Sequence, residues 1–235
     1  MNFNTESPGS LNDFRWREFD AYLFDIDGTL LNSRDGVHYH AFHNAMRAVL
    51  GCDVRIDDVP VHGNTDIGIL KAATRLGGIS DEILAAKLPA VLSRMCEEVE
   101  RYAADLCPEL CPSIRQLLEA LQADGKLLGI VSGNLEPIGW RKLDAAGIRR
   151  YFSFGSFSDR NETRVEIFRW GAAEARRQLG PDARVCFIGD TPSDILAAQS
   201  LQMPVIAVAT GIYPFAKLHS HAPDACISCC DVLLQ

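Results

Sequence analysis

The chain has 235 residues, of which 47% are hydrophobic and 23% charged, and its formal net charge is −8. This composition is typical of a globular protein with a core of ordinary size. The acidic balance disfavours sequence-independent binding to nucleic acid, which depends on Lys and Arg facing phosphates. No apolar run approaches the roughly 18 residues of a membrane span, and the polar first residues lack the apolar segment of a signal peptide. We therefore expect a cytoplasmic protein with neither nucleic acid nor membrane as a partner.

Five short apolar runs predict buried strands, and most are followed by Gly, Asp, Asn or Ser. Their near-continuous apolarity is typical of strands covered on both faces, as in a parallel sheet. The runs are 21–26, 126–132, 151–156, 183–189 and 204–210. Apolar stripes with helical spacing accompany them at 113–123, 137–146, 164–179 and 194–201. This alternation predicts an α/β fold, a doubly wound parallel sheet.

The stretch between the first two strands is about ninety residues long, far more than a crossover needs. Its apolar positions follow helical spacing, as at Tyr39, Phe42 and Met46. We predict an all-helical domain inserted at 33–107, with the prolines of "CPELCP" (107–112) at the return. The α/β core would consist of 20–32 and 108–235, preceded by a flexible segment at 1–19.

Polar residues follow the predicted strands at the point where each strand ends, which is where ligands bind in open parallel sheets. Clustered carboxylates repel one another unless a cation is present, and ligand sets made only of oxygen suit Mg²⁺. Hydroxyl, backbone N–H and guanidinium groups at the same edge would bind an oxyanion, of which phosphate is the obvious example. The residues at these ends are Asp25, Asp27, Gly28, Thr29, Ser132, Gly133, Asn134, Asp159, Arg160, Gly189, Asp190, Thr191 and Asp194.

The motif "DIDGT" (25–29), a serine after the second strand, and "GDTPSD" (189–194) resemble three of the four motifs of the haloacid dehalogenase-like hydrolase superfamily. The helical insert directly after the first motif resembles the small helical cap of that superfamily. Within it, "HGNTDIGIL" (62–70) is similar to the cap of phosphoglycolate phosphatase-like members. The resemblance implies a Mg²⁺-dependent phosphatase that acts on a small phosphorylated metabolite through an aspartyl-phosphate.

The resemblance also implies a role for each matching residue. Asp25 would attack phosphorus, and Asp27 would protonate the leaving oxygen and then deprotonate the hydrolytic water. The metal set would be Asp25, the Asp27 backbone carbonyl, Asp190, and Asp194 directly or through water. Gly28 would allow a tight turn. The phosphate-binding set would be Gly28, Thr29, Ser132, Gly133, Asn134 and one arginine.

The region of the third motif departs from the family, where a lysine is usual. It reads "SDRNETRVEIF" (158–168) and contains no lysine. Either Arg160 or Arg164 must supply the cation, which is chemically sound because Arg is always charged and can hold two oxygens at once. We favour Arg160, because it follows the strand end in a loop whereas Arg164 stands where the next helix should begin.

Several other functions remain compatible with parts of the pattern. A phosphomutase of the β-phosphoglucomutase type shares the two aspartates, and a catalytically idle binding protein would keep the fold. Asp27 argues against a dehalogenase, since a leaving halide needs no proton. No cap lysine is marked as the Schiff-base group of a phosphonoacetaldehyde hydrolase. The spacing of the eight cysteines is a poor match to a zinc site.

Overall fold

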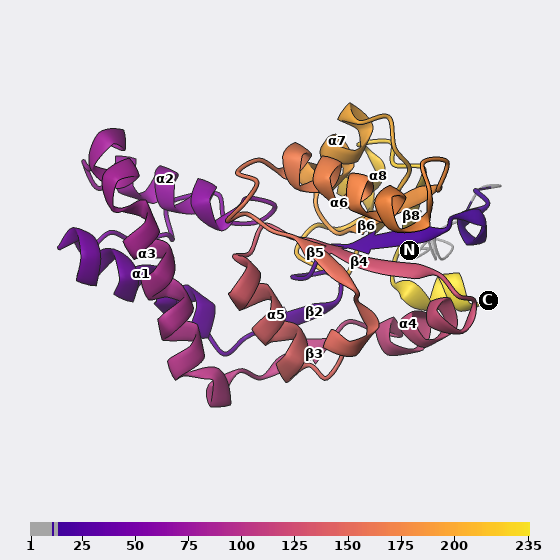
Figure 1. Cartoon of the computed structure of the whole chain (residues 1–235), viewed down its shortest axis with the longest axis horizontal. Coiled ribbons are helices and arrows are strands. Elements are labelled where there is room, and N and C mark those ends of the chain that lie inside the picture. Colours follow the sequence, from indigo (N-terminus) through magenta and orange to yellow (C-terminus); the bar gives the residue numbers. More distant parts are fainter. Residues whose placement is uncertain (1–10, 12–13) are drawn as a thin grey trace, which may run out of the picture.

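The computed structural model describes residue 11 and residues 14–235. Six parallel strands form one sheet in the order β5-β4-β1-β6-β7-β8, with helices on both sides (Figure 1). The strands are β1 (Ala21–Phe24), β4 (Leu127–Val131), β5 (Phe154–Ser156), β6 (Val185–Gly189), β7 (Val205–Val208) and β8 (Ala225–Ile227). The predicted doubly wound α/β fold is confirmed, and the first five strands lie within the five predicted runs. β8 is an additional strand, too short and too close to polar residues to be predicted from its sequence.

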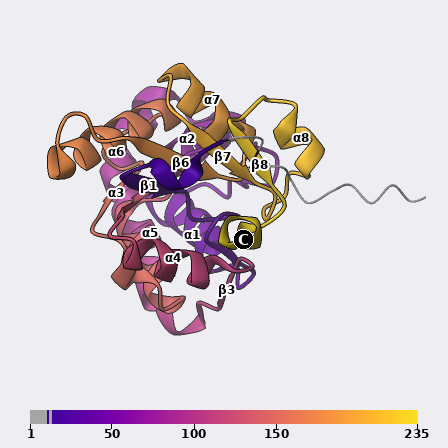
Figure 2. The ribbon, with the colours of Figure 1, turned by 90° about the vertical axis from the view of Figure 1, so that its right-hand side faces the viewer.

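The two faces of the sheet are covered by separate sets of helices. α4 (Ile114–Ala123) and α5 (Glu136–Ala145) lie on one face, where Tyr22 and Phe24 belong to the same buried cluster as Ile114. On the other face, Leu23 belongs to a cluster with Phe168, under α6 (Arg164–Leu179), α7 (Pro192–Ser200) and α8 (Phe215–His219). Figure 2 shows the same layers from the side. Because neighbouring side chains of a strand point to opposite faces, β1 contributes to both clusters and is buried throughout.

Three helices form the insert between β1 and β4. They are α1 (Val37–Leu50), α2 (Asp66–Leu76) and α3 (Asp81–Arg101), which share one buried cluster. A two-stranded antiparallel ribbon of β2 (Leu31–Ser33) and β3 (Pro108–Leu110) connects them to the sheet, and Figure 1 shows them to one side of it. We call this helical insert the cap. The boundaries at 33 and 107 stay a prediction; the ribbon lies at those positions.

The segment 1–19 was expected to be flexible, and residues 1–10, 12 and 13 of it lie outside the described residues. Nearer the sheet, Trp16–Glu18 forms a 3-10 helix and Trp16 is buried. The hydroxyl of Tyr22 donates to the Trp16 carbonyl. The described end of this segment is therefore packed on the core. In the described part of the chain, none of the helices is long and apolar enough to cross a membrane.

Candidate active site

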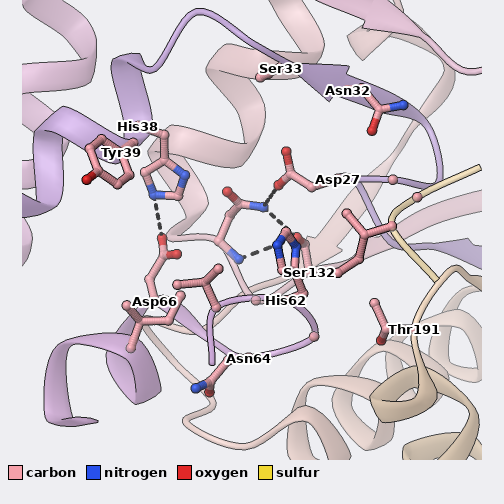
Figure 3. Close-up of a pocket in the computed structure, with 18 of the residues that line it drawn as sticks. Asp27, Asn32, Ser33, His38, Tyr39, His62, Asn64, Asp66, Ser132 and Thr191 are labelled. Carbon is pink, nitrogen blue, oxygen red and sulfur yellow. Dashed lines mark hydrogen bonds and ion pairs between the residues drawn. The ribbon is translucent and has the colours of Figure 1, made fainter. Parts of the chain in front are cut away.

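A cavity of about 670 Å³ lies between the carboxyl ends of the strands and the cap (Figure 3). The core contributes Asp25, Asp27, Ser132 and Asp190 to its wall, among others. The cap contributes polar groups such as His38 and apolar side chains. The apolar cap residues are Phe42, Ile56, Val59, Val61 and Ile69. Residues separated by more than 150 positions in the sequence thus face one cavity.

Three carboxylates meet at the floor of this cavity. Asp25 follows β1, Asp190 follows β6 and Asp194 lies in the first turn of α7, and each is at most 5% exposed. One oxygen of each lies within 4.8 Å of the other two, and among the described residues this is the one such group of His, Cys, Asp or Glu found. Burial and the neighbouring carboxylates raise the pKa of Asp25 to about 6, although Arg164 opposes the shift. Burial, together with Asp194 and Asp25, raises the pKa of Asp190 well above its usual range. Burial and mutual repulsion disfavour the ionised forms of these carboxylates, and a bound cation would offset that repulsion.

The turn after β1 brings the first motif against Asp190. Gly28 has a φ of +85°, and a Cβ at this position would lie 2.2 Å from Asp190 Oδ2, so only glycine fits. The hydroxyl of buried Thr29 donates to Asp190 Oδ1 over 3.0 Å. Both residues were predicted in the phosphate-binding set; in the structure Gly28 leaves room for Asp190, and Thr29 holds it by a hydrogen bond.

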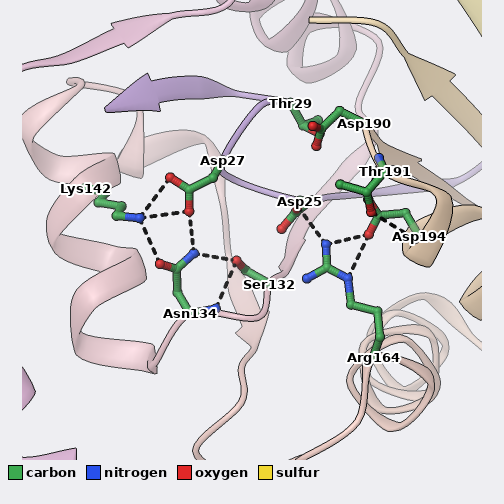
Figure 4. A network of polar contacts seen from close by, with 10 residues as sticks. All are labelled: Asp25, Asp27, Thr29, Ser132, Asn134, Lys142, Arg164, Asp190, Thr191 and Asp194. Atoms are coloured by element: carbon green, nitrogen blue, oxygen red, sulfur yellow. Dashed lines mark hydrogen bonds and ion pairs between the residues drawn. The ribbon is translucent and has the colours of Figure 1, made fainter. Parts of the chain in front are cut away.

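Asp27 turns away from the cluster, with its side chain 43% exposed toward the cavity. Lys142 Nζ on α5 lies 2.8 Å from both of its carboxylate oxygens, and Asn134 Nδ2 lies 2.8 Å from one of them (Figure 4). Desolvation alone would raise the pKa of Asp27, but the adjacent Lys142 ammonium and Asn134 lower it below the usual value. Asp27 is therefore held as a carboxylate by two hydrogen-bonding partners.

Lys142, which is only 3% exposed, was not among the predicted site residues. Its one signal was its position in the apolar stripe of its helix, in line with Leu135 and Ile138 at helical spacing. A lysine on a buried helix face needs an anionic partner, and the spacing could not name Asp27 as that partner.

The loop after β4 forms another part of the wall. Ser132 is 1% exposed and its Oγ lies 2.8 Å from Asn134 Nδ2. The Gly133 carbonyl accepts from the Asp66 backbone N–H over 2.8 Å. A Cβ on Gly133 would lie 2.4 Å from the Asn64 carbonyl oxygen. The structure thus brings to the cavity Ser132, Gly133 and Asn134. The cap segment 64–66 lies directly against Gly133.

The two candidate arginines have different surroundings. Arg164 begins α6, is buried, and lies with Nη2 2.7 Å from Asp25 Oδ2 and with Nε 2.8 Å from Asp194 Oδ1. Arg160 is not brought to the cluster: its side chain is 66% exposed and pairs with Glu136 at 3.0 Å. The cation beside the carboxylates is therefore Arg164, the alternative that the sequence analysis ranked second.

Asp194 has both oxygens occupied by protein donors. Arg164 donates to Oδ1, and the Thr191 hydroxyl and backbone N–H donate to Oδ2 over 2.7 and 3.0 Å. The Asp25 and Asp190 carboxylates are less fully engaged, so the oxygen-only donor set fits a hard cation such as Mg²⁺ best between these two.

From the cap, His38 lines the same cavity, and its ring centre lies 5.0 Å from that of Phe42. Its Nε2 lies 3.2 Å from Asp66 Oδ2, which also accepts from the Leu135 backbone N–H over 2.8 Å. Asp66 is buried. Asp66 thus connects the cap to the loop after β4, and both members of the pair line the cavity (Figure 3).

Comparison with known proteins gives a consistent result. The chain is 27% identical over 218 residues to a phosphoglycolate phosphatase of Synechococcus elongatus, covering 92% of this chain and 95% of that one. A crystal structure of a predicted phosphoglycolate phosphatase from Haemophilus somnus has a TM-score of 0.65 at 20% identity, covering 92% and 97% of the two chains. A β-phosphoglucomutase from Clostridium difficile has a TM-score of 0.64 at 18% identity, with 92% and 93% covered.

These two structures share the fold. A family model described as haloacid dehalogenase-like hydrolase matches residues 19–202, which include the turn after β1, the cap, and the carboxylates after β6. The resemblance that the motifs indicated is confirmed. The chain belongs to the haloacid dehalogenase-like hydrolases.

Proposed function

We propose that this protein is a Mg²⁺-dependent phosphatase that hydrolyses a small phosphorylated metabolite through an aspartyl-phosphate intermediate. One observation carries the proposal: Asp25 and Asp190 lie within 4.8 Å of each other, and the second carboxylate of the motif, Asp27, faces the same cavity. A nucleophile next to a cation site, with a separate group to handle the proton, is what phosphoryl transfer to a carboxylate requires.

In the first step, Asp25 Oδ forms a bond to phosphorus as the ester P–O bond breaks, and Asp27 gives a proton to the leaving oxygen. In the second step, Asp27 removes a proton from water, whose oxygen attacks phosphorus and releases phosphate from Asp25. Ser132 would donate to a phosphoryl oxygen, and Arg164 would orient Asp25 and reduce the repulsion in the cluster. When bound by Asp25, Asp190 and the Asp27 carbonyl, Mg²⁺ would supply charge neutralisation for the phosphoryl oxygens.

The placement of Arg164 supports an active enzyme over an idle binding protein. The feature that would favour an idle protein is the absence of a lysine from the third motif. Arg164 supplies a buried cation that contacts both Asp25 and Asp194, so the cluster has its positive partner without a lysine there.

The test is phosphate release in the presence of Mg²⁺, first from p-nitrophenyl phosphate and then from a panel of phosphorylated metabolites. The panel includes 2-phosphoglycolate, because phosphoglycolate phosphatases are among the relatives. It also includes β-glucose 1-phosphate, whose conversion to an isomer without phosphate release would identify a phosphomutase instead. No turnover of any ester by the folded, Mg²⁺-loaded protein would contradict the proposal.

We expect Mg²⁺ to raise the melting temperature of the protein more at pH 7.5 than at pH 5. The pKa of Asp25 is raised from 3.8 to about 6, and that of Asp190 is raised well above its usual range. The stability that the raised pKa of Asp25 contributes is full below pH 3.8 and lost as pH rises through 6, since the ionised carboxylate is buried and is repelled by its neighbours. Bound Mg²⁺ removes this repulsion, and at low pH it must compete with protons.

At a free Mg²⁺ concentration 100-fold above the dissociation constant, the gain at pH 7.5 should be about 2.7 kcal/mol, or several degrees. The measurement is a thermal melt with and without Mg²⁺ at each pH. Asp190→Asn is the control and should abolish the shift. An equal shift at both pH values would contradict the assignment of the cation to this cluster.

A further inference from the structure

Asp27, Asn134, Ser132 and Lys142 form one continuous hydrogen-bonded network along the cavity wall (Figure 4). Lys142 Nζ lies 2.9 Å from Asn134 Oδ1 as well as 2.8 Å from both Asp27 oxygens. Asn134 Nδ2 lies 2.8 Å from both Asp27 Oδ2 and Ser132 Oγ. Lys142 and Asn134 are nearly fully buried, so solvent does not supply alternative partners.

The chemistry of Lys142 fixes the direction of every bond in this network. An ammonium group can only donate, so the atom of Asn134 that faces it must be the amide oxygen. The amide nitrogen then faces Asp27 and Ser132, and an ionised carboxylate can only accept. A flipped amide would place NH₂ against the ammonium and oxygen against the carboxylate, which is repulsive at both ends.

The orientation of Asn134 has a consequence for Ser132. Because Ser132 Oγ accepts the N–H of the Asn134 side chain, its own single hydrogen remains free to point into the cavity. With the amide flipped, the serine hydroxyl would instead donate to Asn134 Oδ1. A phosphoryl oxygen is an acceptor, so only the first arrangement presents the hydroxyl that a bound phosphate needs.

We propose that Lys142 is a positioning residue that acts through Asn134, setting the direction of the Ser132 hydroxyl for phosphoryl binding while it holds the Asp27 carboxylate in place. This inference rests on the proposed function, because it takes the phosphoryl group to be the ligand of Ser132. Lys142 differs in this role from Arg164, which contacts Asp25 and Asp194 on the opposite side of the site.

The experiment measures binding of inorganic phosphate by calorimetry at saturating Mg²⁺ in four proteins: wild type, Lys142→Met, Asn134→Ala and the double variant. Each single substitution should weaken phosphate binding by about tenfold, as expected for the loss of one hydrogen bond to a charged group. The double variant should bind about as weakly as the weaker single variant, because both act through one amide. Unchanged binding in Lys142→Met, or a multiplied loss of about a hundredfold in the double variant, would overturn the inference.

Two further variants separate positioning from a loss of structure. Arg141→Met is the matched control, since Arg141 immediately precedes Lys142 in α5 but is half-buried and pairs with Glu100 of α3 instead of Asp27. It should leave phosphate binding unchanged, and a loss equal to that of Lys142→Met would overturn the inference. Lys142→Gln keeps an N–H donor of similar length and should bind phosphate more tightly than Lys142→Met; equal or weaker binding would overturn it.

Kinetics add a readout that a merely structural role would not move. In Lys142→Met, kcat for p-nitrophenyl phosphate should also fall, because Asp27 loses both of its contacts with Lys142. Ser132→Ala should weaken phosphate binding but leave the contacts of Asp27 with Lys142 and Asn134 in place. Since phosphate binding requires no turnover, an inactive wild type would contradict the proposed function while the calorimetry still decides the role of Lys142.

Discussion

Asp25→Asn should lower kcat for p-nitrophenyl phosphate by about a thousandfold or more, because an amide cannot form the acyl-phosphate bond. The substitution preserves shape, and the amide oxygen can still accept from Arg164. Since the pKa of Asp25 is raised to about 6, its negative charge is unfavourable in the metal-free fold at pH 8. The melting temperature of metal-free Asp25→Asn at that pH should therefore equal or exceed that of the wild type. Activity and melting temperature are measured on the same preparation.

Asp159→Asn is the matched control for this prediction. Asp159 also follows a strand of the sheet, but it lies outside the cavity wall and accepts from the Glu136 backbone N–H over 3.2 Å. Its substitution should leave kcat within about twofold of the wild type, as for most substitutions away from the reacting groups. Retained activity in Asp25→Asn would show that another group attacks phosphorus. A trapped phosphate on the wild-type protein after acid quenching, absent in Asp25→Asn, would support the covalent step.

The sequence predicted the floor of the site well because that part depends on local rules. A short apolar run followed by Asp25 and Gly28 predicts a buried strand and a turn, and parallel strands end at one edge of a sheet. Asp190 follows another such run, so its approach to Asp25 follows from the fold class alone. Strand β8 was missed because three residues between polar neighbours give no pattern that can be distinguished from a loop.

The walls of the site were harder to predict because they depend on contacts between side chains from different helices and strands. Extended side chains such as those of Lys and Arg can reach several partners. Lys142 lies on a helix that could have faced several partners, and only tertiary packing directs it to Asp27. Thr163 and Glu166 form a capping box that starts α6 at Arg164, and the spacing T-x-x-E was visible in the sequence. Side chains at a helix start lean toward its N-terminus, so Arg164 extends toward the strand ends.

The network around Asp27 also qualifies how the two predicted catalytic carboxylates divide their roles. Asp25 has a raised pKa and contacts Arg164, whereas Asp27 has a lowered pKa and contacts Lys142. Each carboxylate thus has its own buried cation, supplied by helices on opposite faces of the sheet. The lowered pKa keeps Asp27 ionised, which is the form that the base of the second step requires. Its use as an acid in the first step requires Asp27 to take up a proton despite the Lys142 ammonium beside it.

Arg164→Met should lower both stability and activity, whereas Arg160→Met should change neither. Removing Arg164 leaves Asp25 and Asp194 buried without their cation, and breaking a buried ion pair by removing one partner costs about 3–5 kcal/mol. The kcat for p-nitrophenyl phosphate should fall by about a hundredfold, since Asp25, the proposed nucleophile, loses the group that orients it. Arg160 is largely exposed and makes one surface pair with Glu136, which is worth about 0–1 kcal/mol.

The measurements are denaturant unfolding and steady-state kinetics of both variants with saturating Mg²⁺. Arg164→Lys separates a loss of folding from a loss of function. It keeps the charge but lacks the planar guanidinium that contacts Asp25 and Asp194 together. Compared with Arg164→Met, it should therefore recover most of the stability and only part of the activity. A larger loss of kcat in Arg160→Met than in Arg164→Met would reverse the assignment, and would mean that the loop carrying Arg160 moves to the phosphoryl group when substrate binds.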